Sequence, residues 1–350
     1  MRGILKAVAY QPGWTDRGRR VRGPDEDAFS MAATAIERAV PGHAATESRW
    51  TVRVTGPVLA NVSDGFSAVL GGPVELHEGP IGLGGLAEEI SQAVHGNGPQ
   101  LVVAVDLDPD ASGAGSARVV LPTEGAVAFV VDEAPEGSPP PVDLGPLPPG
   151  AYVVPRLAAV HRVQGAASPL RWVGDWDAAL GKGRPAGRWG DITTDPPPVR
   201  VSEGAYLPKP RYREGRASRW RLVADHCTAC GAVSFPSRGR CRQCLRGDRL
   251  EPHPLPLDGA TVLATTWIGR GGQPTEFDAA VEASGPYGVV IVELEPGVRA
   301  TLPVADAAPG EIRINDRVGT RLRRLYAIDG EWRYGRKAVP LGSPDGPGPS

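Results

Sequence analysis

Four cysteines form the clearest chemical pattern in the sequence. They stand as two Cys-x-x-Cys pairs with ten residues between the pairs: Cys227, Cys230, Cys241 and Cys244. Each pair can hold two thiolates on one tight turn. Two such turns joined by a short hairpin present four sulfurs in the tetrahedral arrangement that Zn²⁺ prefers. Because four protein ligands leave no open coordination position, we expect one structural zinc ion per chain. A redox-active dithiol and an iron site are alternatives that remain open at this point.

The distribution of charge and of cysteine narrows the classes of function. The 350 residues carry a formal net charge of −2, yet residues 200–250 contain twelve Lys or Arg against four Asp or Glu. A basic segment inside an acidic chain indicates a local phosphate-facing feature or a solvated linker, not a general nucleic-acid surface. All four cysteines lie within residues 227–244. This excludes a thiol nucleophile from the N-terminal half.

The sequence has no feature that predicts a membrane or an oxidising compartment. No apolar run reaches the roughly 18 residues that suggest a transmembrane helix. The N-terminal apolar stretch is too short for a signal peptide. Since paired Cys-x-x-Cys motifs outside a secretory context favour metal binding over disulfides, we expect a cytoplasmic protein.

Residues 1–134 alternate between strand-like and helix-like patterns. The acidic run Pro24-Asp25-Glu26-Asp27 marks the start of a helix, and Pro41-Gly42 marks its end. Strands alternating with helices predict a layered α/β domain. The predicted strands are 3–10, 50–55, 73–77, 101–106 and 125–131, and the predicted helices are 28–40, 63–70 and 81–94.

The rest of the chain divides by composition into a connector and two small domains. Residues 135–200 are rich in Pro, Gly and Trp, which indicates a linker or a partly ordered connector. Residues 201–254 hold a helical lead-in and the cysteine cluster. Residues 255–340 show short apolar runs separated by turn residues, the pattern of a small β-barrel. Residues 341–350 consist mainly of Gly, Pro and Ser, so we expect a disordered tail.

Residues 201–340 resemble the DUF35 family. The resemblance rests on three runs that occur in order: RWRLVADHCTACGAVSFPSRGRCRQC, PYGVVIVELEPGVRATL and YGRKAVP. It implies a rubredoxin-like zinc ribbon followed by an OB-fold, in an accessory subunit of an acyl-CoA enzyme. Related sequences often carry an aromatic residue after the Lys of the last run, where this chain has Ala338. This departure affects the expected packing around Ala338 and leaves the family resemblance unchanged.

The same resemblance implies contact with a CoA thioester. CoA carries a 3′-phosphate and a pyrophosphate, which guanidinium groups bind well. Five arginines of the basic segment are therefore candidate CoA-binding residues: Arg219, Arg221, Arg238, Arg240 and Arg242. For any one of them, solvation of a small ribbon is an equal alternative.

Residues 1–133 resemble the N-terminal half of a thiolase-superfamily protein of the hydroxymethylglutaryl-CoA synthase and ketoacyl synthase III branch. This resemblance rests on the order of the elements and on the run RGPDED before the first helix. In that superfamily a nucleophilic Cys begins a buried helix, whose dipole lowers the thiol pKa. The corresponding helix here is 81–94, and Pro80 or a neighbour occupies the place of the Cys. The companion thiolase half is also missing, because the connector leads to the zinc ribbon instead.

Together the two resemblances imply a non-catalytic or co-catalytic subunit, and we assign no catalytic residue. It would form a hetero-oligomer with a thiolase- or ketosynthase-like partner. It would help to bind or channel acyl-CoA for carbon–carbon bond formation or cleavage, as in polyketide or lipid metabolism. A single-stranded nucleic-acid-binding protein is one alternative, because zinc ribbons and OB-folds often bind single strands. A self-sufficient acyltransferase is another, with Ser63 and Ser67 as poor candidate nucleophiles.

Overall fold

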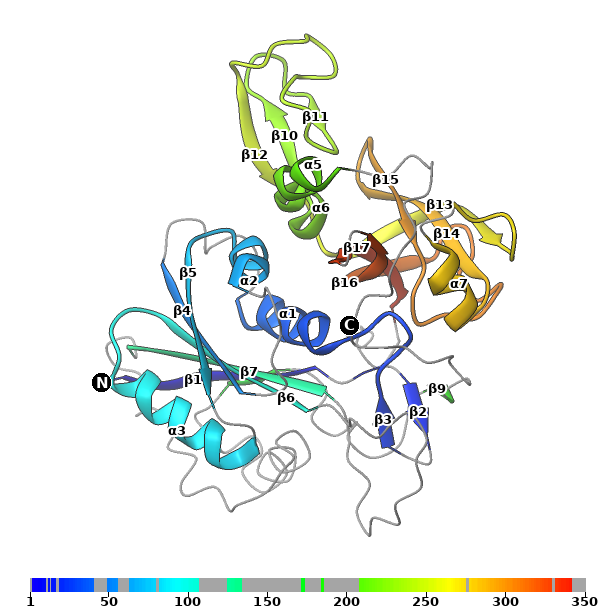
Figure 1. Cartoon of the computed structure of the whole chain (residues 1–350). Helices are drawn as coiled ribbons and strands as arrows, with labels where there is room; N and C mark the ends of the chain where they lie inside the picture. Colours follow the sequence, from blue (N-terminus) through cyan, green and yellow to red (C-terminus); the bar gives the residue numbers. More distant parts are fainter. Residues whose placement is uncertain are drawn as a thin grey trace. The chain divides into compact units, whose positions relative to one another are not determined.

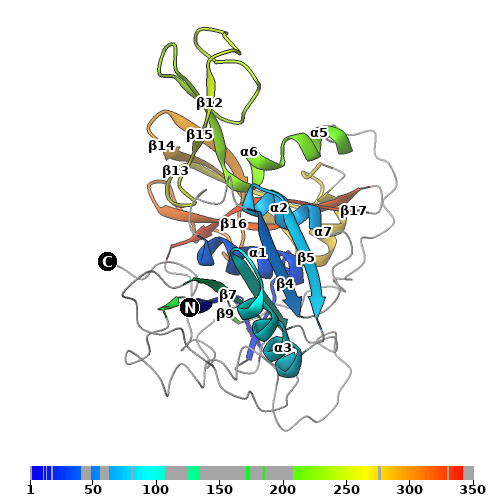
Figure 2. The same cartoon turned by 90° about the vertical axis from the view of Figure 1, so that its left-hand side faces the viewer.

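The computed structural model divides the chain into two units, residues 1–187 and 188–350. The structure describes residues 2–10, 12, 14–16, 19–40, 49–55, 63–79, 82–106, 125–133, 171–173, 184–185, 208–274, 277–328 and 331–341. Most of the predicted connector 135–200 and of the predicted tail 341–350 therefore lies outside the described residues. Figures 1 and 2 show the helices and strands of each unit. Across the described ranges, no helix has the length and apolarity needed to cross a bilayer.

The first unit is built on a six-stranded mixed sheet with helices on both faces. Its elements are β1 Arg2–Tyr10, α1 Ala28–Ala39, β4 Trp50–Thr55, α2 Ser63–Leu70, β5 Val74–Gly79, α3 Gly82–His95, β6 Gln100–Asp106, β7 Gly125–Glu133 and β8 Arg171–Val173. The strand order is β5-β4-β6-β7-β1-β8. Strands β5, β4 and β6 are parallel, and β7 runs antiparallel to β6 and β1. Helices α1 and α3 cover opposite faces of the sheet (Figure 1). The predicted α/β layering is therefore present.

A second, smaller sheet belongs to the same unit. It pairs β2 Trp14–Asp16 with β3 Arg19–Val21 and, in parallel, with β9 Arg184–Pro185. The sequence patterns did not predict these short strands.

The central strands of the large sheet are buried on both faces. Every residue of β6 is buried, and its run QLVVAVD is almost continuously apolar, as expected of a strand covered on both sides. Val102 and Ala104 of β6 pack with Leu86 and Ala93 of α3. Because side chains alternate along a strand, the intervening residues of β6 point to the face that α1 covers.

Side chains hold helix α1 at both ends. Asp27 and Ser30 form a capping box: the Asp27 carboxylate accepts the Ser30 N–H at 2.8 Å, and the Ser30 hydroxyl accepts the Asp27 N–H at 2.9 Å. At the other end, the Lys6 ammonium donates to the carbonyls of Arg38 and Ala39 at 2.7 and 2.8 Å. A cation is favourable there because the C-terminal end of the helix dipole is negative.

The second unit starts with two short helices and a small three-stranded sheet. Its first elements are α5 Lys209–Glu214, α6 Arg216–Arg221, β10 Val223–Cys227, β11 Val233–Ser234 and β12 Leu250–Pro254. The strands lie in the order β11-β10-β12, all antiparallel. The four cysteines belong to this ribbon, since Cys227 ends β10 and the other three lie between β10 and β12.

A five-stranded antiparallel barrel follows the ribbon. Its elements are β13 Asp258–Ile268, α7 Asp278–Ser284, β14 Tyr287–Glu295, β15 Val298–Pro303, β16 Arg317–Ile328 and β17 Glu331–Pro340, with strand order β15-β14-β13-β16-β17. A bridge between Val304 and Ala338 brings the two edges together, and the Ala305 N–H donates to the Ala338 carbonyl at 2.9 Å. The barrel is therefore nearly closed, as in an OB-fold.

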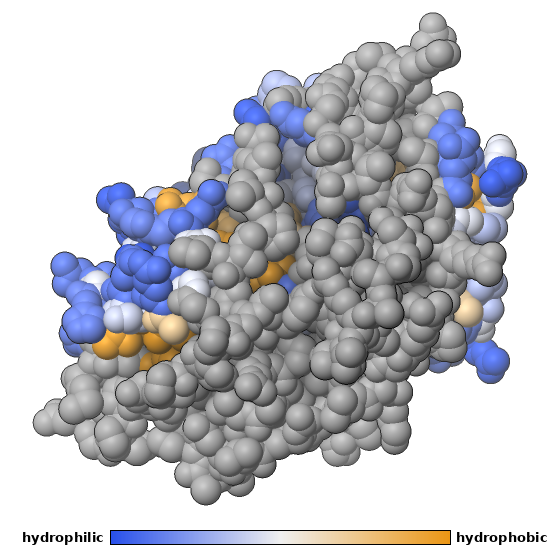
Figure 3. Space-filling model, turned by 60° about the horizontal axis from the view of Figure 1, so that its bottom comes forward, coloured by the Kyte–Doolittle hydropathy of each residue, from blue (hydrophilic) through white to orange (hydrophobic). Residues whose placement is uncertain are grey.

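One hydrophobic core joins the ribbon to the barrel. Leu222 and Ala224, which precede the first cysteine, pack with Val262, Val292 and Val318 of the barrel strands. Both residues are almost fully buried. On the face shown in Figure 3, the described side chains that reach the surface are mostly hydrophilic, with small hydrophobic patches between them.

Candidate functional site

The four cysteines that the sequence predicts as metal ligands converge at one point. Their Sγ atoms all lie within 4.8 Å of one another. Cys227 Sγ lies 3.6 Å from Cys244 Sγ, and Cys230 Sγ lies 3.5 Å from Cys241 Sγ. A regular tetrahedron of sulfurs about 2.3 Å from a zinc ion has similar edges. The donor set fits a structural zinc ion, because four thiolates fill its coordination sphere.

The two knuckles that carry the ligands share one backbone geometry. The Gly231 N–H donates to the Cys227 carbonyl at 2.8 Å, and the Leu245 N–H donates to the Cys241 carbonyl at 3.1 Å. Gly231 and Leu245 thus occupy equivalent positions, and both have a positive φ, 74° and 62°. Glycine adopts this region freely, whereas a residue with a Cβ is strained there.

Backbone amides stabilise the thiolate of Cys241. The N–H groups of Cys244 and Gln243 point at its Sγ atom, at 3.5 and 3.3 Å. These hydrogen bonds lower the pKa of the Cys241 thiol to about 6. Cys241 is therefore a thiolate at neutral pH, which is the form that binds metal.

Two of the predicted CoA-binding arginines lie on α6. Arg219 is exposed, whereas Arg221 is half-buried. Burial lowers the pKa of Arg221, because a low-dielectric surrounding disfavours the charged form. Ser218, which precedes Arg219, accepts a hydrogen bond from the Ser237 N–H at 3.2 Å, and this bond ties α6 to the loop before the second knuckle.

The other three arginines lie in that loop and in the second knuckle. Arg238, Arg240 and Arg242 are all exposed. The Arg242 guanidinium donates to the Gly297 carbonyl at 3.3 Å, in the turn between β14 and β15. The two groups of arginines are thus on adjoining parts of the second unit. That any of the five contacts CoA stays a prediction.

Aromatic residues of the barrel contact one another. Phe277 stacks on Tyr287 with ring centroids 5.5 Å apart, and its centroid lies 5.3 Å from that of Tyr326. The Arg324 guanidinium lies 4.6 Å from the centroid of Trp332. All four rings are half-buried: Phe277, Tyr287, Tyr326 and Trp332. Single-stranded binding by stacking requires exposed ring faces, so this arrangement gives the nucleic-acid alternative little support.

The tyrosine of the run YGRKAVP is held by two residues that the sequence analysis did not single out. The Tyr212 phenol accepts the Tyr334 N–H at 2.8 Å and lies 3.3 Å from the Tyr334 carbonyl, to which it donates. The Trp220 Nε1–H donates to the same carbonyl at 3.0 Å. Arg333 places its guanidinium 4.5 Å from the centroid of the Tyr212 ring. These contacts fix α5 and α6 on strand β17.

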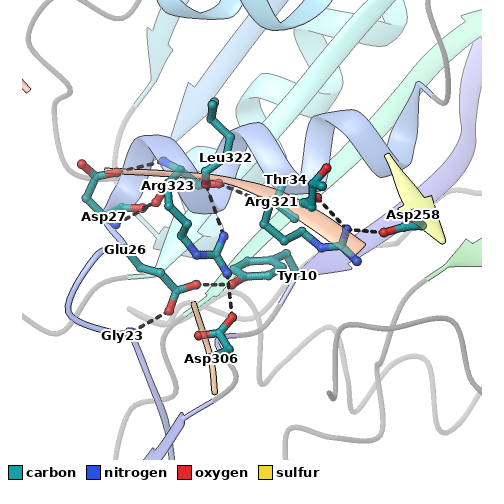
Figure 4. Close-up of polar contacts among 12 residues, drawn as sticks. Tyr10, Gly23, Glu26, Asp27, Thr34, Asp258, Asp306, Arg321, Leu322 and Arg323 are labelled. Carbon is teal, nitrogen blue, oxygen red and sulfur yellow. Dashed lines mark hydrogen bonds and ion pairs between the residues drawn. The ribbon is translucent and has the colours of Figure 1, made fainter. Parts of the chain in front are cut away.

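In the first unit, the run RGPDED forms a buried polar turn before α1. The Tyr10 phenol donates to one oxygen of the Glu26 carboxylate, and the Gly23 N–H donates to the other at 2.6 Å (Figure 4). Glu26 is fully buried, and these bonds satisfy both of its oxygens. The run that carries the thiolase resemblance therefore has a structural role in setting the start of α1.

In the second unit, strand β16 carries two buried arginines with carboxylate partners. Arg321 donates to Asp258 at 2.7 Å, and Arg323 pairs with Asp306 at 3.2 Å (Figure 4). These pairs link β16 to β13 and to the segment after β15.

A second buried network lies between β4 and α3 of the first unit. The Arg53 guanidinium donates from Nε to Gln100 at 2.9 Å, and from Nη1 to Glu89 at 3.1 Å and to Gln92 at 2.8 Å. The side chains of Arg53 and Glu89 are only 11% and 6% exposed. The network holds α3 on the sheet. Pro80, where the thiolase resemblance places the nucleophile, lies outside the described residues, as does the side chain of Ser63.

Comparison with known proteins identifies relatives of the part of the chain that contains the zinc ribbon. Residues 216–251 match the model of the ChsH2 rubredoxin-like zinc ribbon domain. A DUF35 domain-containing scaffold protein from Methanocaldococcus jannaschii is 33% identical over 125 residues, which is 35% of this chain and 84% of that protein. Another from Methanothermobacter thermautotrophicus is 35% identical over 124 residues, again 35% of this chain and 88% of that protein.

Solved structures are similar to part of the chain. The Ltp2-ChsH2(DUF35) aldolase matches 35% of this chain and 85% of its own, with 23% identity and a TM-score of 0.28. The β-ketoacyl-[acyl carrier protein] synthase III of Thermus thermophilus matches 39% of this chain at 22% identity, with a TM-score of 0.32. The chain spans only 53% of that synthase. The two archaeal DUF35 proteins are more than 30% identical to this chain and are covered over most of their length, so the chain belongs to the DUF35 family.

Proposed function

We propose that this chain is an accessory scaffold subunit that docks on a thiolase- or ketosynthase-like enzyme and helps to hold an acyl-CoA thioester. The observation that carries the proposal is the match to two archaeal DUF35 proteins named as scaffold proteins, over 84% and 88% of their length. Each match is longer than residues 216–251, which the zinc ribbon model covers.

The chemistry of the chain supports an accessory role. Its four cysteines all lie in the zinc ribbon, so residues 1–226 offer no thiol for the acyl transfer of a thiolase. The zinc site has four thiolate donors and no open position, which suits a structural ion and not a Lewis acid. In the part of the chain that the structure describes, no hydrogen bond joins the Ser67 hydroxyl to a histidine. Ser67 therefore gives the alternative of a self-sufficient acyltransferase no support.

The α/β unit would contribute a thiolase-like surface to the complex. Residues 1–133 resemble half of a thiolase-superfamily protein in the order of their elements. The partner would supply the nucleophile and form or cleave a carbon–carbon bond at a thioester by Claisen or retro-aldol chemistry. This chain would bind the CoA moiety through two arginines of α6, Arg219 and Arg221.

Co-expression tests the docking. The full chain is produced with a thiolase- or ketosynthase-like protein from the same gene neighbourhood, with a tag on one of the two. We expect both proteins to elute together in size-exclusion chromatography at a defined ratio, and the partner's turnover to increase. If the two proteins elute separately and the partner is equally active and soluble alone, the proposal is wrong.

Calorimetric titration with CoA tests the arginines. Replacing Arg219, the exposed candidate on α6, by Ala should weaken binding of CoA to the complex by tenfold or more, because the change removes a charge-assisted contact to phosphate. Arg299, an exposed arginine of β15, provides the matched control, and Arg299→Ala should bind CoA as the wild type does. Equal losses in both variants would show a general charge effect and not a site.

A further inference from the structure

Leu245 is a large hydrophobic residue whose conformation and exposure the fold of this chain does not require. It follows the last zinc ligand and is 71% exposed. Its φ of 62° lies in the left-handed region, where the Cβ of an L-residue is too close to the following carbonyl. The side chain gains no burial in return.

Leu222 shows what compensates this strain elsewhere in the same ribbon. Its φ is 52°, but the residue is only 1% exposed and belongs to the core between ribbon and barrel. The equivalent position in the first knuckle holds Gly231, which adopts the conformation without strain. The second knuckle therefore keeps a strained and exposed leucine where glycine would satisfy the fold. Such departures from local folding rules concentrate at functional sites.

The surface around Leu245 is positively charged. Residues 238–249 contain five arginines and one aspartate. The aspartate, Asp248, is already paired with Arg246 at 2.9 Å and with Arg249 at 3.6 Å. Even after the double negative charge of a zinc tetrathiolate is subtracted, a positive charge remains on this segment. Within the described residues, no hydrogen bond or ion pair engages the guanidinium groups of Arg238 and Arg240.

We infer that Leu245 and the arginines of residues 238–249, here called the second-knuckle surface, form the docking surface for the enzyme partner. The inference rests on the proposed function and names the part of the chain that makes the contact. The partner would present an apolar pocket that receives Leu245, rimmed by carboxylates that face the arginines. A leucine that enters a pocket of the partner removes its apolar side chain from water. The arginines around it belong to a residue type enriched at interface hot spots, and their charges set specificity and association rate.

Two other kinds of partner fit the surface less well. One leucine buries too little apolar area to anchor a protein on a membrane. A nucleic acid would use the arginines through its phosphates but would gain nothing from an exposed aliphatic side chain. The leucine is thus the feature that favours a protein.

The test measures the affinity of the zinc-loaded full chain for its thiolase- or ketosynthase-like partner. Leu245→Gly and Leu245→Asn both suit a positive φ and remove the apolar side chain. We expect each to weaken binding by tenfold or more, with one zinc ion per chain and an unchanged or higher Tm. The control is Ile314→Ser, since Ile314 is 57% exposed on the barrel, and it should bind within twofold of the wild type. Arg240→Glu should slow association at low salt, and high salt should reduce this difference.

The following results would contradict the assignment of the docking surface. If Leu245→Gly binds as tightly as the wild type, the second-knuckle surface is not the docking surface, while the scaffold function stands. If the wild type itself does not bind, both proposals are wrong. A Tm several degrees lower in Leu245→Gly would show that the leucine packs within its own chain, and would overturn the inference. Binding of a single-stranded oligonucleotide that is lost in Arg240→Glu and kept in Leu245→Gly would also overturn it.

Discussion

The phenol of Tyr212 forms hydrogen bonds with both backbone groups of Tyr334, as a residue of a paired strand would. It accepts the Tyr334 N–H at 2.8 Å and reaches the Tyr334 carbonyl at 3.3 Å. One side chain from α5 thereby satisfies both polar groups of a residue in β17. The lead-in helices are consequently part of the barrel's structure and not a flexible approach to it.

Removing that phenol should destabilise the second unit. Tyr212→Phe leaves the Tyr334 N–H without its partner in a buried site, and such a loss costs ~1–3 kcal/mol. We expect a matching decrease in the free energy of unfolding in urea, with zinc content unchanged. Trp220→Phe removes one bond to the same carbonyl and leaves Tyr212 in place, so it provides the comparison. A change below about 0.3 kcal/mol for Tyr212→Phe would show that water replaces the hydroxyl without loss.

The same residue should make stability depend on pH in the alkaline range. Burial raises the pKa of Tyr212 to about 12, compared with about 10 for an unfolded tyrosine. The folded state therefore keeps a proton that the unfolded state releases, so stability is full below pH 10 and falls as the pH rises toward 12. The contribution is about 2 to 3 kcal/mol. Urea unfolding of wild type and Tyr212→Phe between pH 8 and pH 11.5 measures it, and parallel curves for the two proteins would contradict the assignment.

Zinc should protect every thiol of the chain. The sequence has four cysteines, and all four are predicted zinc ligands, so a thiol reagent should find no reactive group in the loaded protein and four after chelation. We expect chelation to release one zinc ion and to lower the Tm by several degrees, because metal binding at a structural site stabilises the fold. Cys241→Ser should show the same loss of zinc without a chelator. Four reactive thiols in the presence of bound zinc would exclude a four-cysteine site.

The network of Arg53 should behave as a buried ion pair. Glu89→Leu leaves the guanidinium of Arg53 without its carboxylate at low exposure, which typically costs ~3–5 kcal/mol. The double variant Arg53→Met with Glu89→Leu should recover most of this loss, because no uncompensated charge remains. Urea unfolding of the two single variants and the double variant measures the coupling energy. Additive losses would mean that the two side chains stabilise the unit independently.

Local patterns were sufficient to predict much of the fold. The spacing of the cysteines alone predicts the zinc ligands, since a Cys-x-x-Cys knuckle is formed by consecutive residues. The predicted helices 63–70 and 81–94 correspond to α2 and α3, and the predicted strands 50–55 and 101–106 correspond to β4 and β6. These segments have clear periodicity, and burial on the sheet agrees with it.

Features that depend on distant contacts were not predictable in this way. Strand β17 contains Glu331, Arg333, Arg336 and Lys337, so its sequence lacks an alternating apolar pattern. Arg333 and Arg336 are nevertheless buried, one over the Tyr212 ring and one donating to the Trp220 carbonyl. Their burial arises from packing against α5 and α6, which lie more than a hundred residues earlier in the chain. No local pattern in β17 or in the two helices predicts that these segments contact each other.

The shared core between ribbon and barrel makes metal affinity a property of both. Ala224 belongs to that core, and Cys227, three residues later on the same strand, is a predicted zinc ligand. A ligand or partner that stabilises the barrel must therefore raise the affinity of the ribbon for zinc. Bound zinc must stabilise the barrel by an equal free energy, since thermodynamic coupling is reciprocal. Measured zinc affinity would then report on whatever occupies the barrel, even a ligand that never comes near the metal.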